Sequence, residues 1–221
     1  MTESQPWLRF YESHVSPHLE YPQTTLPQAL AETARRCPDV AAMLFKGRRI
    51  TYREHDAAVD RFAAALEELG VRKGDRVAVH LPNCPQFVIT FYGALRAGAV
   101  VVPCNPIYTA RELRHQLRDS GAMAIVTLSS TYPILRQIRG ETALKHIVVA
   151  RIKDYFPPLL RLIFTLLLEK KRGHRLSLKG ELEASWFMDL MGRASKKPKP
   201  VPISLDDTAV LMYTGGTTGL S

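Results

Sequence analysis

The sequence predicts an α/β fold built on a mostly parallel sheet. Between residues 75 and 150, apolar segments of five to seven residues alternate with longer segments of helical periodicity. Some of the short segments, such as AVVV at 99–102, are apolar at every position, which is typical of strands covered on both faces. The chain has 221 residues, of which 46% are hydrophobic, and this is enough for the core of one domain.

Two helices and a hairpin are expected before the regular part. The first helix begins near Thr25, a residue type that caps helices, and ends before Pro38. Two short apolar runs then flank Lys46 and Gly47, which indicates a hairpin. A second helix, 51–70, begins with a threonine and a glutamate at capping-box spacing and ends at a glycine.

The regular part follows. Asn83 and Gln86 are expected to cap its first helix. Strands that alternate with helices of about ten residues form βαβ units, so this part should build the parallel sheet. The expected strands are 75–81, 99–103, 122–128 and 145–150, and the expected helices are 83–98, 109–121 and 131–140.

The alternation breaks near residue 151. The segment 151–175 has seven Arg or Lys residues against two Asp or Glu residues, and its apolar residues nearly encircle a helix. The segment 195–207, SKKPKPVPISLDD, is basic and proline-rich like a linker. We therefore expect a basic apolar insert and a linker at about 151–204, followed by a further strand at 207–213.

Two interpretations of 151–175 remain open. Its apolar residues could enter a membrane while the flanking lysines and arginines reach anionic headgroups. Alternatively, the segment is an ordinary core helix with a solvated basic end. The longest apolar stretch, 155–168, is too short to span a bilayer, so no transmembrane helix is expected.

Composition limits the class of protein. A formal net charge of +9 suggests an anionic partner, but the basic runs lack the aromatic residues and motifs of nucleic-acid binding, so no nucleic acid is expected. The chain has an odd number of cysteines and no CxxC pair, so we expect reduced thiols and no zinc site. The three cysteines are Cys37, Cys84 and Cys104. The N-terminus is unlike a secretory signal, which favours a cytoplasmic protein. His80 and His115 are interpreted as structural.

A glycine- and threonine-rich loop, YTGGTTG at 213–219, follows the last expected strand. Loops at the carboxyl ends of parallel strands are where open α/β sheets bind ligands. Glycines let backbone N–H groups face a ligand, and the threonine hydroxyls add uncharged donors, which together suit phosphate oxygens. The loop is neither a Walker A motif nor GxGxxG. On local chemistry alone, a plain glycine-rich turn remains the alternative.

The loop resembles the phosphate-binding signature of the adenylate-forming enzymes, the acyl-CoA synthetase and luciferase superfamily. A second segment agrees independently: LPN, GALRAGAVVVPCNPIYT, REL and DSGA, between 81 and 122, occur in the order found in bacterial long-chain fatty acid–CoA ligases. The resemblance runs from about residue 24 to 221 and is weakest over 151–200.

The resemblance implies an ATP-dependent reaction in two halves. A fatty acid carboxylate attacks the α-phosphate of ATP to give an acyl-adenylate and pyrophosphate, and the thiol of CoA then displaces AMP. ATP, Mg²⁺ and CoA are the implied cofactor and co-substrates. The residues that would hold the β- and γ-phosphates are Thr214, Gly215, Gly216, Thr217, Thr218 and Gly219.

The same resemblance places other parts of the enzyme after this loop. These parts are the adenine contacts, a magnesium-binding acid, most of the acyl tunnel and a mobile C-terminal domain. We therefore assign no catalytic and no metal-binding residue, and expect 1–221 to be an incomplete N-terminal part of an adenylation domain, inactive alone. The alternative is a truncated, non-catalytic protein that binds a membrane or a protein partner. A nucleotide-binding module of another class, such as a kinase, is disfavoured because its motifs are missing.

Overall fold

The computed structural model describes residues 5–195 and 197–214. Its sheets comprise a two-stranded hairpin and a five-stranded parallel sheet. In chain order the elements are η1 (Pro6–Phe10), α1 (Leu26–Arg36), β1 (Ala41–Phe45), β2 (Arg48–Thr51), α2 (Tyr52–Glu68), β3 (Arg76–His80), α3 (Pro85–Arg96), β4 (Val100–Pro103), α4 (Ala110–Ser120), β5 (Ala124–Leu128), α5 (Tyr132–Ile138), η2 (Arg139–Glu141), β6 (His146–Ala150), η3 (Ile152–Tyr155), α6 (Pro158–Ile163), the π-helical η4 (Phe164–Leu168), β7 (Ala184–Trp186) and α7 (Phe187–Arg193).

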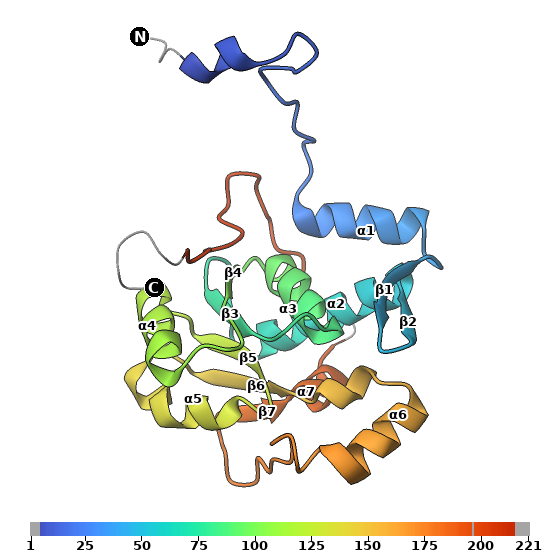
Figure 1. The fold of residues 1–221 in the computed structure, drawn as a ribbon, viewed down its shortest axis with the longest axis vertical. Helices are drawn as coiled ribbons and strands as arrows, with labels where there is room; N and C mark the ends of the chain where they lie inside the picture. The colour runs from blue at the N-terminus through green and yellow to red at the C-terminus, as the bar shows by residue number, and fades with distance from the viewer. Residues whose placement is uncertain (1–4, 196, 215–221) are drawn as a thin grey trace.

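The large sheet confirms the predicted α/β class. Its strands lie in the order β4-β3-β5-β6-β7, and all neighbouring pairs are parallel. Helices cover both faces: α2, α3 and α7 lie on one side, and α4 and α5 on the other (Figure 1). All five residues of β5 are buried, as expected for strands between two helical layers.

Alternate residues of each strand enter different cores. Val77 and Val79 of β3 pack in the core with α2 and α3, while Ala78 between them packs in the core with α4 and α5. β5 alternates in the same way, with Val126 in the first core and Ile125 in the second. This period of two is the geometry of a strand, and it explains why the strand sequences are apolar throughout.

Most expected helix starts are found. Thr51 caps α2, and Thr109 caps α4, each with a capping box to the glutamate three residues later. The expectation for 83–98 was wrong in one respect: Cys84 occupies the N-cap of α3, and the Gln86 amide donates instead to the carbonyl of Arg151 at 2.9 Å. Pro in the first turn fixes the start of α3 there, because proline fits the first helical positions.

The sheet has a fifth strand that the sequence did not predict. β7 pairs in parallel with β6 through Ile147↔Ala184, Val148↔Ser185 and Val149↔Trp186. α7 follows at once and packs on β6 and α2. Both elements fall inside 151–204, where an insert and a linker were expected. A strand of three residues is too short to show a periodic pattern, which explains why it was missed.

The segment 155–168 is not a core helix. Five large apolar side chains on it are exposed, and we name them the leucine ridge: Leu159, Leu162, Ile163, Leu166 and Leu167, with exposed fractions of 71%, 56%, 41%, 72% and 70%. Phe164 is buried, with its ring against Phe156 (5.4 Å between centroids) and His174 (5.5 Å). Nowhere in the described part of the chain is a helix long and apolar enough to cross a membrane.

Candidate phosphate-binding site

The chain that leads into the glycine- and threonine-rich loop lies beside β4. The backbone N–H of Val101 donates to the carbonyl of Ala209 at 2.9 Å, and the N–H of Leu211 donates to the carbonyl of Val101 at 2.9 Å. The strand predicted at 207–213 was therefore wrong, because only an isolated parallel bridge, Val101↔Val210, forms.

This parallel bridge fixes the direction of the chain. Because residues 209–211 run in the same direction as β4, Thr214 lies toward the carboxyl edge of the sheet. β3, β5 and β6 end at this same edge, since every pair in the sheet is parallel. This is the edge at which open α/β sheets bind ligands.

Tyr213 anchors the start of the loop to α4. Its side chain packs with the core under α4 and α5, and its hydroxyl donates to Asp119 Oδ2 at 2.5 Å. Burial raises the pKa of Tyr213 to about 12, and the hydrogen bond to Asp119 acts in the same direction. Tyr213 is therefore occupied in packing and in its bond to Asp119.

The segment expected as a linker is held on the body of the protein. Lys73 Nζ lies 2.6 Å from Asp207 Oδ2 and donates to the carbonyl of Pro202 at 2.8 Å. Lys199 pairs with Glu67 at 3.0 Å. The hydrogen bond from Lys73 lowers the pKa of the Asp207 carboxyl. These contacts bring the chain from α7 back across the helical layer to β4.

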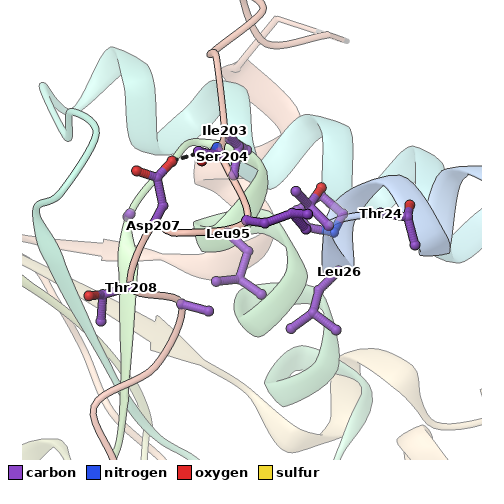
Figure 2. Close-up of a pocket in the computed structure, with 13 residues that line it drawn as sticks. Thr24, Leu26, Leu95, Ile203, Ser204, Asp207 and Thr208 are labelled. Carbon is purple, nitrogen blue, oxygen red and sulfur yellow. Dashed lines mark hydrogen bonds between the residues drawn. The ribbon is translucent and has the colours of Figure 1, made fainter. Parts of the chain in front are cut away.

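A small apolar pocket lies under this returning segment. Figure 2 shows it between the start of α1, the end of α3 and residues 203–209, with Leu26 and Leu95 in its wall. The N–H of Ser204 donates to Asp207 at 2.7 Å and closes the turn above it. Its volume is about 170 Å³. Ligand sites usually have about 300–1,000 Å³, so this pocket is too small for a nucleotide.

The strand order places a switch point between β3 and β5. β4 lies on one side of β3 and β5 on the other, an order in which ligands bind at the carboxyl ends of the two diverging strands. There, His80 Nδ1 lies 3.1 Å from Thr127 Oγ1, and Thr127 Oγ1 lies 2.8 Å from Thr131 Oγ1. Sequence reasoning singled out His80 but missed this cluster, because its members are far apart in the chain.

His80 is a buried, neutral group. Its exposed fraction is 0%, and Nε2 has no hydrogen-bond partner among the residues described. Burial lowers the pKa of His80 to about 4. The imidazole therefore stays uncharged near neutral pH and supports the end of β3.

The predicted phosphate-binding residues are only partly described. Thr214 is exposed, next to the anchored Tyr213. Gly215, Gly216, Thr217, Thr218 and Gly219 lie outside the described residues, so their predicted role stays a prediction. Within 5–195 and 197–214, no group of three or more His, Cys, Asp or Glu side chains is arranged to hold a metal ion.

Comparison with known proteins gives a consistent result. The family described as AMP-binding enzyme matches residues 30–221. A long-chain-fatty-acid–CoA ligase of Bacillus subtilis (strain 168) is 38% identical, covering 99% of this chain and 39% of the relative. The corresponding ligase of Yersinia pestis is 37% identical, covering 97% of this chain and 39% of its own length. The chain thus spans about two fifths of the length of these relatives.

Solved structures agree in fold. An anthranilate CoA ligase solved with anthranoyl-AMP superposes with a TM-score of 0.73 at 23% identity, covering 90% of this chain and 34% of that one. A long-chain-fatty-acid-CoA ligase from Archaeoglobus fulgidus superposes with a TM-score of 0.69 at 25% identity, covering 92% and 37%. Since the family match also covers most of the residues, the resemblance seen in the sequence is confirmed: this chain belongs to the AMP-binding enzyme family.

Proposed function

We propose that the protein carrying this chain activates a long-chain fatty acid with ATP and transfers the acyl group to CoA. The direction of residues 209–211 supports the proposal, because the chain that precedes the loop runs toward the carboxyl edge of the sheet, where open α/β sheets bind ligands. Relatives named long-chain-fatty-acid–CoA ligase match nearly the whole chain, which favours this function over a non-catalytic one.

In this proposal, the loop holds the β- and γ-phosphates of ATP. The fatty acid carboxylate attacks the α-phosphorus, the bond to pyrophosphate breaks, and CoA thiol later displaces AMP from the acyl group. The backbone N–H groups and hydroxyls of Thr214, Gly215, Gly216, Thr217, Thr218 and Gly219 would stabilise the negative charge of the leaving pyrophosphate. They act by position and need no net charge.

Mg²⁺ is implied by the family but has no ligand set among the described residues. A hard divalent ion prefers several oxygen ligands, including carboxylates and phosphates. We therefore assign no metal ligand to this chain and derive no step through the ion.

Fatty-acid-dependent exchange of labelled pyrophosphate into ATP tests the proposal. It should be measured on the protein in the length in which its source makes it. Thr217→Ala with Thr218→Ala should reduce the exchange by about 10²-fold or more, the usual cost of removing a donor to developing charge. Thr208→Ala, an exposed threonine outside the loop, is the matched control. Unchanged exchange in the loop variant would refute the assigned role. Residues 1–221 alone are expected to form no acyl-CoA.

A second proposal concerns location: the protein works in the cytoplasm and contacts the inner face of the membrane through 151–175. The exposed leucine ridge supports this contact, since large exposed apolar patches mark interaction surfaces. Cys37, Cys84 and Cys104 are free thiols, which suits a reducing compartment. Leu162→Gln with Leu166→Gln should weaken sedimentation with anionic vesicles at least tenfold. Equal sedimentation of the variant would contradict the contact.

A further inference from the structure

A groove separates the β1–β2 hairpin from α6. Its hairpin wall is the turn at Gly47 and Arg48, and its other wall is α6 with Arg161 and Leu162. Phe156 and two prolines supply much of the apolar lining, and the volume is about 630 Å³. This volume is within the range of ligand sites, and the groove is distinct from the carboxyl edge of the sheet.

Two guanidinium groups stand in this groove. Arg48 lies over the ring of Tyr155, 5.2 Å from its centroid, and its Nη1 donates to the carbonyl of Asp154 at 3.5 Å. Arg161 Nη2 lies 3.9 Å from Asp154 Oδ1, which is a long ion pair. The Asp154 side chain is only 6% exposed, whereas that of Arg161 is 55% exposed, so this long pair leaves the Arg161 guanidinium accessible. Guanidinium groups are well shaped to bind phosphate oxygens in pairs.

The groove opens onto the leucine ridge. Leu162 belongs to both, so the apolar surface is continuous. Ridge positions repeat at three and four residues and thus form one face of a helix, and Phe164 holds that helix on the body. An apolar stripe that faces outward on an anchored helix is suited to enter an acyl layer.

The charges around the ridge favour an anionic surface. Lys170, Lys171, Arg172 and Arg175 are all exposed after η4. The acid in the same stretch, Glu169, is paired with Lys153 at 2.6 Å, and both side chains are about 15% exposed or less. The negative charges are therefore recessed and compensated, while the positive charges face solvent.

We propose that this groove binds the headgroup of an anionic phospholipid, with Arg48 and Arg161 on its phosphate and the leucine ridge among the acyl chains. The inference rests on the membrane contact proposed above and adds a specific lipid site to it. Diffuse attraction would treat all exposed cations alike, about equally per charge. A headgroup site instead depends on the two groove arginines.

Two double variants separate these cases, because each removes two exposed positive charges. Arg48→Gln with Arg161→Gln empties the groove of cations. Lys170→Gln with Lys171→Gln leaves the groove intact and is the matched control. Each variant is made in the full length that its source produces, and its binding to vesicles of phosphatidylcholine with and without phosphatidylglycerol is measured. Each is also titrated with monomeric short-chain phosphatidylglycerol below its micelle concentration, and Arg161→Lys tests the need for the planar group.

Both double variants should lose affinity for phosphatidylglycerol vesicles, but only the groove variant should lose binding of the monomeric lipid, at least tenfold. Arg161→Lys should lose part of the affinity for the monomeric lipid. Glycerol phosphate, which has no acyl chains, should compete at least tenfold more weakly than the lipid. Equal loss of monomeric-lipid binding in both double variants would overturn the inference. Competition by glycerol phosphate as strong as that by the lipid would also overturn it.

The two proposals fail separately. If the unaltered protein binds vesicles but not the monomeric lipid, the groove site is wrong and the membrane contact stands. Binding of the monomer without binding of vesicles removes the membrane contact and leaves a site for free lipid, so the inference of a membrane headgroup site is overturned. Binding of neither removes both.

Discussion

The packing around Gly93 in α3 predicts how a substitution there changes the stability of the protein. A methyl group added there would lie 2.8 Å from Phe62 Cδ1 and 3.2 Å from Phe62 Cβ. Phe62 is 0% exposed and stacks on Phe187 with 5.1 Å between the ring centroids. The ring therefore has no free space to move into, and α2 and α3 would have to separate.

Two effects of Gly93→Ala oppose each other. Alanine improves helix propensity by about 1 kcal/mol, whereas overpacking a filled core costs about 1–3 kcal/mol. The packing term should win because the contact lies with a fixed ring, and we expect net destabilisation of roughly 1 kcal/mol. Gly192→Ala in α7 is the control, since nothing lies within 4 Å of the added methyl group. It should stabilise by up to about 1 kcal/mol.

Urea denaturation of the three proteins measures these changes. With a slope of about 2 kcal/mol/M, the midpoint of Gly93→Ala should fall by roughly 0.5 M while that of Gly192→Ala does not fall. Phe62→Leu would make room, so the double variant should show a coupling energy of roughly 1 kcal/mol. If Gly93→Ala were as stable as the unaltered protein, the close approach of α2 and α3 would not be the reason for glycine.

Three further predictions concern buried groups. Burial lowers the pKa of His80 from 6.5 in the unfolded chain to about 4. The contribution of His80 to the free energy of unfolding is therefore present above pH 6.5 and is lost as the pH falls toward 4. Between these pH values the stability of His80→Asn, measured by urea denaturation, should depend less on pH than that of the unaltered protein. Arg96 forms ion pairs with Asp56 and Asp60 at 2.7 Å each. Arg96→Met should therefore lower the free energy of unfolding, measured by urea denaturation, by about 2–3 kcal/mol. A smaller loss of stability when both acids are replaced together with Arg96 would confirm the pairing. Burial raises the pKa of Cys84 to about 11 and that of Cys104 to about 12, so both stay in the unreactive thiol form. Iodoacetamide should therefore modify Cys37 first, as mass spectrometry of the labelled protein would show.

Sequence reasoning was successful where one segment carries its own signal. The strands of valine and isoleucine and the capping boxes at Thr51 and Thr109 are local patterns, and the structure confirms them. The arrangement at the switch point is different, because the contact of His80 with Thr127 joins positions far apart in the chain. β7 was missed because its pairing with β6, and not its own three residues, makes it a strand.

The leucine ridge shows a further limit. Apolar residues that nearly encircle a helix are compatible with burial on any side, so periodicity could not decide which of them face solvent. The contact of Phe164 with Phe156 and His174 decides it, and this tertiary contact turns the five side chains of the leucine ridge outward.

Most of the net charge lies in a different part of the sequence from the proposed phosphate loop. The segment 151–175 carries seven basic and two acidic residues, more than half of the formal charge of +9, whereas 213–219 carries none. Phosphate bound by neutral N–H and hydroxyl groups depends less on screening than a lipid surface bound by exposed lysines and arginines. Raising the salt concentration from 0.05 to 0.5 M should therefore release the protein from anionic vesicles. The Michaelis constant for ATP should change several-fold less over the same range. Parallel salt dependence of both would mean that the basic segment also attracts the nucleotide, and the separation of the two surfaces would be wrong.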